Sequence, residues 1–200
     1  MESPKIRNAG IMSDLQGFFQ PGQREAIYDN CDTPRQKLIV RMLWKTGRRI
    51  GEILRIKVNE IDFENNNILW HIEKKKRNYP KWKPSDKETM AMIQKYITMV
   101  GLVPDDYLFV NENTGRPITR QAAYKFIVKA AKKSQIFFVG IKKPHPHHFR
   151  HSFAIDKARK LKSPADMRKL QQYMEHSDMG MTEQYLQFGD EDQRSLVEDD

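Results

Sequence analysis

The segment Pro144-His145-Pro146-His147-His148-Phe149-Arg150-His151-Ser152 contains four of the six histidines of the chain. A helix is predicted from His147 to Lys160. His147 and Arg150 are three residues apart, so both side chains project from one side of this helix. An imidazole can carry a proton near neutral pH, and a guanidinium can clamp a phosphate through two parallel hydrogen bonds. The pair therefore indicates chemistry at a phosphate group.

The same histidines also allow a metal site as the alternative, because His147 and His151 are four residues apart on one helix face. The chain has one cysteine and no His-Glu-x-x-His sequence that would add ligands. The metal interpretation is therefore disfavoured, and neither a metal nor a cofactor is expected. His151 is kept as a supporting residue.

A second segment upstream, Thr46-Gly47-Arg48-Arg49-Ile50-Gly51-Glu52-Ile53-Leu54, contains two adjacent arginines. Residues 48–55 are predicted to form a short turn or helix whose apolar residues face the core, which would fix the position of an arginine here. Glu52 follows Arg49 by three residues and can hold its guanidinium by a charge-assisted hydrogen bond. A surface arginine pair beside a helix end is the alternative.

Most of the chain shows helical patterning. Spacing, capping residues and terminal glycines predict helices at residues 22–30, 32–46, 85–101, 119–133, 147–160 and 164–173. Ser85 and Glu88 have the spacing of a capping box at the start of one helix, and Ser163 is predicted to cap the last. The fold class expected is mainly α with a small antiparallel β-sheet (α+β).

The sheet is predicted from the segment after Asn65-Asn66-Asn67, which reads as a tight turn. Ile68, Trp70 and Ile72 alternate as in a half-buried strand, and the chain returns through Trp82. Between the two strands, Lys74-Lys75-Lys76-Arg77 forms a basic hairpin tip. Such a charge run is usually solvated, but a hairpin can also enter a DNA groove and place an ammonium near a phosphate.

Near the C-terminus, His176 precedes Tyr185 by nine residues. A single tyrosine at such a place more often packs than reacts. Together with the two arginines, a lysine and His147, however, these residues form a set that can surround a phosphodiester and stabilise the charge of its transition state. A phenol is a weak nucleophile at neutral pH, so neighbouring cations and a base are needed. No carboxylate cluster suited to Mg²⁺ accompanies the set.

The composition favours a polyanionic partner. The formal net charge is +9 and the pI is near 9.5, although the last eleven residues include six acids and one arginine. Cys31 is the only cysteine, so no intramolecular disulfide can form and a reducing compartment is expected. The sequence contains no apolar run long enough to span a membrane and no secretory signal at its start, so a soluble, cytoplasmic protein is expected. Its basic charge favours association with DNA.

The four segments in this order resemble the tyrosine recombinase (phage integrase) family. Thr46-Gly-x-Arg49-x-x-Glu52-x-Leu54 resembles the first arginine box, and His147-His-Phe-Arg150-His151 resembles the H-x-[LF]-R-H box. His176 and Tyr185 have the spacing of the family's C-terminal histidine and tyrosine, and Ile72-Glu-Lys74 matches the strand that delivers the hairpin lysine. The resemblance spans residues 22–188.

The resemblance implies a mechanism. Tyr185 would attack the scissile phosphate to give a 3′-phosphotyrosyl link and a free 5′-hydroxyl. Arg49 and Arg150 would hold the non-bridging oxygens, and Lys74 would protonate the leaving oxygen. In the same family-based assignment, His147 assists proton transfer at the tyrosine and His176 binds the phosphate. Double-stranded DNA is the implied partner, bound by a homotetramer on two duplexes that passes through a Holliday junction, without metal or ATP.

The domain organisation predicted is a lead-in or linker at residues 1–20, a catalytic domain at 21–188 and an acidic tail at 189–200. Met174-Glu175-His176 stands where the family has Leu-Gly-His, and Lys75 or Lys76 could replace Lys74 as the acid. Family members usually carry an N-terminal clamping domain, and the sequence leaves open whether one is missing. Predicted DNA contacts outside the catalytic set are Lys75, Lys76, Arg77, Arg48 and Arg120.

Three other functions fit parts of the pattern. A type IB topoisomerase uses similar phosphate chemistry, but those enzymes usually carry lysine where His147 stands. A DNA-binding regulator or excision factor without catalysis would not need the whole set of reacting groups. A generic basic helical binding module would need none of them. Site-specific recombination is therefore the preferred interpretation.

Overall fold

The computed structural model describes residues 17–73, 78–161 and 163–174. In chain order the helices are α2 (Gln23–Asp29), α3 (Pro34–Thr46), α4 (Ile50–Leu54), α5 (Lys87–Val100), α6 (Arg120–Lys133), α7 (Pro146–Ala158) and α8 (Pro164–Met174), with a 3₁₀ turn η1 (Val58–Glu60). The strands are β1 (Ile61–Asp62), β2 (Asn67–Glu73) and β3 (Asn78–Pro84). They form one antiparallel sheet in the order β1-β2-β3. The predicted fold class, mainly α with a small antiparallel sheet, is confirmed.

The sheet buries one face against the helices. Ile68, Trp70 and Ile72 of β2 are all fully buried, as their alternation predicted. The return strand β3 runs two residues beyond Trp82, and its residues pair directly with those of β2, for example Lys83 with Ile68. Residues 74–77, which connect β2 and β3, lie outside the described residues.

The helices that matter for the site begin and end at capping residues. The Thr33 hydroxyl accepts a hydrogen bond from the Gln36 backbone N–H at the start of α3, and Gly47 ends that helix with a left-handed φ of 61°. The Ser163 hydroxyl accepts from the Asp166 backbone N–H at 3.2 Å, so the cap predicted for α8 is present.

Several predicted helix boundaries differ by one or two residues, for example the end of α7, which lies at Ala158 and not at Lys160. Asp86, not Ser85, caps α5: its carboxylate accepts from the Thr89 backbone N–H at 3.0 Å and also binds Arg41 of α3 at 2.9 Å. The tertiary ion pair thus favours the carboxylate over the neighbouring hydroxyl. Helix α7 begins at Pro146, one residue before the predicted start, because proline suits the first turn and His145 accepts from the His147 N–H.

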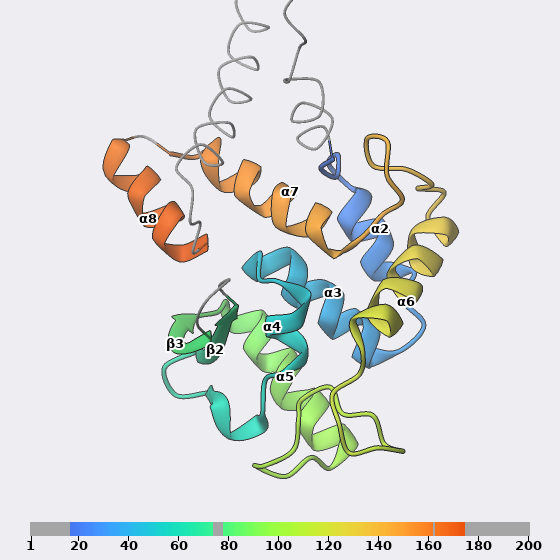
Figure 1. Ribbon diagram of the computed structural model, residues 1–200, viewed down its shortest axis with the longest axis vertical. Helices are drawn as coiled ribbons and strands as arrows, with labels where there is room; N and C mark the ends of the chain where they lie inside the picture. The colour runs from blue at the N-terminus through green and yellow to red at the C-terminus, as the bar shows by residue number, and fades with distance from the viewer. Residues whose placement is uncertain (1–16, 74–77, 162, 175–200) are drawn as a thin grey trace, which may run out of the picture.

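Helix α7 carries His147 and Arg150 and joins two parts of the helical framework. It packs across α3 on one side and against α8 on the other (Figure 1). Phe149 of α7 joins the main core, whereas Phe153 belongs to a second apolar cluster shared with α8. Phe19 lies in the predicted lead-in, yet its ring is 4.6 Å from that of Phe149, so packing extends into that segment.

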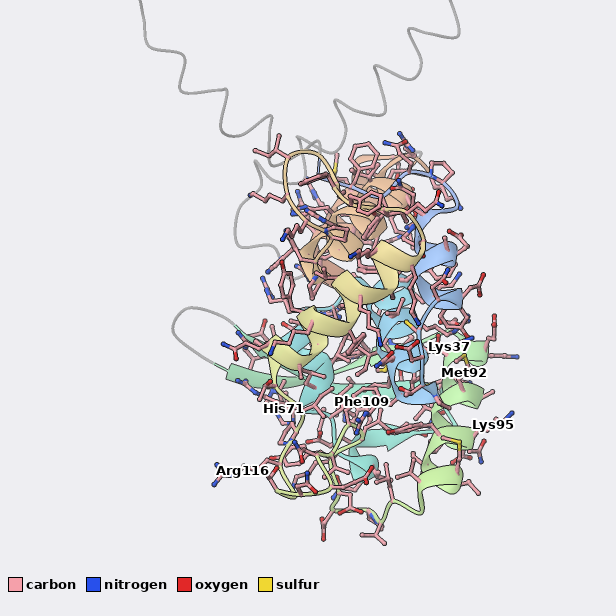
Figure 2. The ribbon with its side chains drawn as sticks, turned by 90° about the vertical axis from the view of Figure 1, so that its right-hand side faces the viewer. Lys37, His71, Met92, Lys95, Phe109 and Arg116 are labelled. Carbon is pink, nitrogen blue, oxygen red and sulfur yellow. The ribbon has the colours of Figure 1, made fainter. Side chains whose placement is uncertain are left out.

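Apolar side chains fill the interior of this helical framework, and charged side chains cover its surface. Phe109 points into the interior between the helices, whereas Lys95 and Arg116 project away from it (Figure 2). Within the part of the chain that the structure describes, no helix combines the length and the apolar character that a membrane crossing requires.

Candidate active site

The two arginine segments of the sequence meet directly in the fold. Arg150 Nη1 of α7 donates to the Gly47 carbonyl at 2.9 Å, across 103 positions of sequence. Gly47 stands two residues before Arg49, in the turn between α3 and α4. Arg150 Nη2 also donates to the Met174 carbonyl at the end of α8, at 2.5 Å. Arg150 is 5% exposed and is therefore fixed inside the protein, at a junction of three helices.

Arg49 is positioned from its own helix. The carboxylate of Glu52, which is fully buried, accepts from the Arg49 backbone N–H at 3.2 Å and from Arg49 Nη1 at 3.0 Å. The predicted bond between these two residues is thus present. The Arg49 side chain remains 28% exposed, so its guanidinium is held in place and can still meet an anion from solution.

His147 lies among these arginines. Its pKa is lowered from the usual value, first by partial burial of the ring and then by the positive charges of Arg150, Arg49 and Arg120. The three arginines therefore lie near enough to His147 for their charges to act on its ring. The His151 ring lies 6.4 Å from the His147 ring, on the next turn of α7. A neutral imidazole beside two guanidinium groups can accept a proton at neutral pH.

The family relationship follows from comparison with known proteins. The phage integrase family model matches residues 18–191, most of the chain. The chain belongs to the phage integrase family. A tyrosine recombinase XerC of Lactobacillus leichmannii is 30% identical over 159 residues, which cover 76% of this chain and 50% of that protein. XerC of Staphylococcus carnosus (strain TM300) is 26% identical over 190 residues, covering 91% of this chain and 60% of that protein. The chain thus spans little more than half the length of these relatives.

Solved structures agree in fold. The XerA recombinase superposes with a TM-score of 0.72 at 21% identity, over 92% of this chain and 64% of that one. The XerH site-specific recombinase was solved bound to a palindromic difH substrate in a post-cleavage complex. It has a TM-score of 0.72 at 20% identity, over 92% of this chain and 53% of that one. A lambda integrase dimer bound to a COC′ core site has a TM-score of 0.66 at 16% identity, over 85% of this chain and 47% of that one. The fold of this phage integrase family member is that of a tyrosine recombinase catalytic domain.

Several predicted site residues lie outside the described part of the chain. They are Lys74, Lys75, Lys76, Arg77, His176 and Tyr185. Arg120 is described: it is exposed at the first residue of α6, on the His147 side of the fold. The structure therefore brings together the arginine and histidine boxes of the family, while the lysine and tyrosine assignments remain predictions.

Arg48 differs from the DNA-contacting role predicted for it. It is 1% exposed, and its guanidinium lies 5.5 Å from the Trp70 ring and 4.6 Å from the Tyr173 ring. It donates to the Tyr173 carbonyl. A side chain in this position is not available to a phosphate at the surface, so Arg48 is removed from the DNA-contacting set. Adjacent arginines in the sequence gave no signal of which one faces inward.

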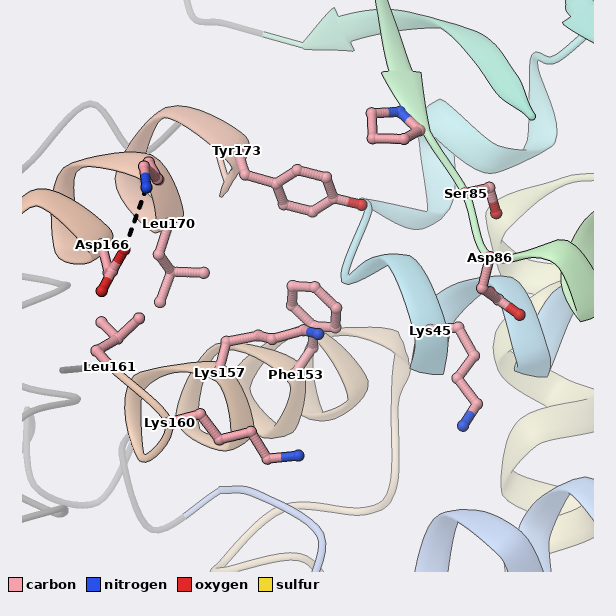
Figure 3. A pocket seen from close by; sticks show the side chains of 12 residues that line it. Lys45, Ser85, Asp86, Phe153, Lys157, Lys160, Leu161, Asp166, Leu170 and Tyr173 are labelled. Atoms are coloured by element: carbon pink, nitrogen blue, oxygen red, sulfur yellow. Dashed lines mark hydrogen bonds and ion pairs between the residues drawn. The ribbon is translucent and has the colours of Figure 1, made fainter. Parts of the chain in front are cut away.

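A pocket of about 650 Å³ lies beside this site rather than in it. Its walls come from α3, α7, α8 and the β3–α5 junction, with Phe153 and Leu170 among the apolar residues (Figure 3). Exposed lysines surround it: Lys45, Lys157, Lys160 and Lys169. Arg49, Arg150 and His147 do not line it. Among the described residues, no group of three or more His, Cys, Asp or Glu side chains is arranged to hold a metal ion.

Gly47 is a site residue whose full importance the sequence did not reveal. A Cβ at this position would lie 2.5 Å from Phe153 Cδ1 and 2.7 Å from Phe153 Cγ, in a backbone with φ of 61°. We expect Gly47→Ala to lower the free energy of unfolding by about 2–5 kcal/mol, since the left-handed backbone and the overpacked ring both oppose the methyl group. Denaturant unfolding measures this loss.

Gly101 provides the matched control for that substitution. It also ends a helix with a left-handed φ, here 75°, but a Cβ there would meet nothing within 4 Å. Gly101→Ala is expected to cost only the backbone part, about 1–2 kcal/mol. Equal losses in the two variants would contradict a close approach of α7 to Gly47.

His148 predicts how stability depends on pH. It is 2% exposed, and burial, followed by the positive charge of His145 when protonated, lowers its pKa to about 3. Below about pH 6.5 the imidazole of His148 is protonated in the unfolded chain but remains neutral in the folded protein. The contribution of His148 to the free energy of unfolding is therefore fully present above that pH and is lost as the pH falls toward 3. Between about pH 7 and 5 the loss from this residue is about 2 kcal/mol.

Urea unfolding at the two pH values, compared between the native chain and His148→Phe, isolates this contribution. The variant keeps a ring beside Phe19 and has no titrating group at this position. We expect its unfolding free energy to fall by about 2 kcal/mol less than that of the native chain over the same interval. Parallel losses in both proteins would show that His148 is accessible to protons in the folded state.

Proposed function

We propose that this chain is the catalytic part of a site-specific tyrosine recombinase, which cleaves and rejoins double-stranded DNA through a covalent link to Tyr185. The observation that carries the proposal is the convergence of Arg49, Arg150 and His147. These residues come from two distant segments, are joined through the Gly47 carbonyl, and share one electrostatic environment. Two permanent cations beside a neutral base suit a phosphodiester that gains negative charge in its transition state.

The two arginines have different supports and complementary roles. Arg49, oriented by the buried Glu52 and partly exposed, binds one non-bridging oxygen of the phosphate. Arg150, fixed by the Gly47 and Met174 carbonyls, directs further N–H groups of its fork to the other. Both charges persist at any working pH, since a guanidinium does not deprotonate in proteins. They supply the charge stabilisation that other nucleases take from a metal ion.

The chemical step balances with the remaining residues of the set. The Tyr185 oxygen forms the bond to phosphorus while the bond to the 5′-oxygen breaks. His147, neutral because of its lowered pKa, accepts the phenol proton, and Lys74 gives a proton to the leaving 5′-oxygen. His176 binds the phosphate. Attack by a 5′-hydroxyl from a partner strand reverses the reaction, so the energy of the broken bond is conserved.

DNA binding is proposed on the face that carries these residues. Arg120 is exposed and its charge acts on His147, and Lys75, Lys76 and Arg77 follow β2 on the chain. The structural neighbours XerH and lambda integrase were both solved with their DNA sites bound, which supports a duplex as the partner here. A homotetramer on two duplexes and a cytoplasmic location belong to the same proposal.

A covalent trapping experiment tests the function. The chain is incubated with nicked duplexes, from which the short cleaved strand diffuses away, and the products are separated on a denaturing gel. We expect a protein–DNA adduct whose phosphotyrosyl residue maps to Tyr185 by mass spectrometry. The duplexes are taken from a random library, since the recognition sequence is not known.

The same experiment separates the alternatives. Recombinant or Holliday-junction products from two duplexes support recombination, whereas supercoil relaxation without them supports a topoisomerase. Binding without any adduct across the library supports a regulator and contradicts the proposed catalysis. In each case binding should weaken steeply with salt, because many phosphates are neutralised.

A further inference from the structure

Three consecutive carbonyl groups at the C-terminal end of α8 each accept a hydrogen bond from a cationic side chain. Lys83 of β3 donates to the Gln172 carbonyl at 3.0 Å, Arg48 to the Tyr173 carbonyl, and Arg150 to the Met174 carbonyl at 2.5 Å. The donors come from the sheet, the α3–α4 turn and α7, so three separate elements hold one helix end.

This arrangement answers an electrostatic need. The last carbonyls of a helix have no partners within it, and they form the negative end of the helix dipole. Cations placed there stabilise the helix end and fix it in space. One cation would be enough to cap the helix; three from different elements also define where the helix end lies relative to the sheet and to the α3–α4 turn.

Arg48 is the costly member of this group. Its guanidinium is 1% exposed between the Trp70 and Tyr173 rings, and Nε and Nη1 find no acceptor within the described ranges. Buried N–H groups without acceptors cost stability, and an apolar side chain of similar length would avoid that cost. Its burial also excludes direct phosphate contact.

The position of Arg48 links two parts of the active site. It is adjacent in sequence to Arg49, which we assign to the phosphate. It also donates a hydrogen bond to the carbonyl of Tyr173, which stands three residues before His176 and twelve before Tyr185 in the sequence. The Tyr173 ring in turn stacks on Phe153 of α7, 5.7 Å away (Figure 3). One side chain thus connects the phosphate-binding turn to the helix that leads into the nucleophile segment.

We propose that Arg48, assisted by Lys83, is a positioning residue that fixes the C-terminal end of α8, the helix that precedes Tyr185 in the sequence, relative to the phosphate-binding arginines. The inference rests on the proposed function. Displacement of a reacting group by about 1 Å can cost about 100-fold in rate, so a residue that never touches DNA can still control cleavage. The consequence is a defect in the chemical step without a defect in DNA binding.

The test is Arg48→Met in the full chain. At saturating DNA, the single-turnover rate of adduct formation should fall by about 10- to 100-fold. The dissociation constant for DNA should stay within about threefold, and the slope of binding against salt should not change, because no phosphate contact is removed. Arg116→Met, which removes an arginine that projects from the surface, is the matched control and should keep the native cleavage rate (Figure 2).

Two further variants keep the test decisive if Arg48→Met folds poorly. Arg48→Lys retains a donor for the Tyr173 carbonyl and should recover part of the rate. Lys83→Met releases the neighbouring Gln172 carbonyl, and we expect a smaller rate loss that is not additive with that of Arg48→Lys, since both residues hold the same helix end. A cleavage rate within twofold of native in Arg48→Met, or a salt slope lowered by about one, would overturn the proposal.

Hydrogen exchange separates this inference from the proposed function. Arg48→Met should expose the amides in the last turn of α8 to faster exchange, whether or not the chain cleaves DNA. If the native chain forms no adduct on any duplex, the proposed function fails while the exchange result still reports the contact. Unchanged protection of α8 in Arg48→Met would show that Arg48 does not hold the helix end.

Discussion

Tyr185→Phe is expected to abolish the covalent protein–DNA adduct while leaving DNA binding intact. Phenylalanine keeps the aromatic ring but lacks the oxygen that would bond to phosphorus. No other atom of the side chain can substitute for it, so adduct formation should fall by at least about 10³-fold. Trapping on nicked duplexes measures the adduct, and fluorescence anisotropy on uncleaved duplex measures binding.

Tyr173 is the informative control, because it is a second phenol close to the arginines. Burial raises its pKa, and the charge of Arg48 only partly opposes that shift, so its hydroxyl has little tendency to ionise. Its ring also stacks on that of Phe153, 5.7 Å away (Figure 3). Tyr173→Phe should keep adduct formation within about threefold of native. Loss of the adduct in this variant, with Tyr185→Phe active, would make Tyr173 the nucleophile.

The fold was largely predictable because local signals agreed with tertiary packing. The alternation of Ile68, Trp70 and Ile72 specified the buried face of β2, and glycines and capping residues marked most helix ends. The prediction failed where two capping residues are adjacent. Ser85 fits the sequence pattern, but Asp86 also pairs with Arg41 of α3, a contact that only the folded chain reveals.

The site was predictable in its chemistry and less so in its geometry. Spacing placed His147 and Arg150 on one side of α7, and three-residue separation matched Glu52 to Arg49. The sequence did not distinguish Arg48 from Arg49. After the left-handed turn at Gly47 one of the two arginines enters the interior, and which one depends on where α4 begins and on the rings that receive it.

Arg150→Ala is expected to produce the second largest effect, on both rate and stability. Loss of a preorganised phosphate donor typically slows cleavage by about 10²- to 10³-fold. The Gly47 and Met174 carbonyls would also lose a donor inside the protein, which we expect to lower the free energy of unfolding by about 3 kcal/mol. Single-turnover trapping below the melting temperature of the variant separates the first effect from the second.

Two comparisons sharpen this prediction. Arg150→Lys keeps the charge, but an ammonium lacks the planar fork of donors that binds a phosphate through two hydrogen bonds. We expect this variant to cleave at less than about a tenth of the native rate. Arg168→Ala removes an exposed arginine from the surface of α8 and should leave rate and stability unchanged. A native cleavage rate in Arg150→Ala would remove this arginine from the phosphate site.

The double variant Arg49→Ala/Arg150→Ala shows whether the two guanidinium groups act on one phosphate. Residues that act as a unit lose most of their effect when the first is removed, so the combined loss should be clearly smaller than the product of the two single losses. Such coupling is expected because Arg150 donates a hydrogen bond to the carbonyl of Gly47, which stands two residues before Arg49. Multiplicative losses would mean that the two arginines stabilise different groups, and that their proximity in the fold serves structure rather than a shared transition state.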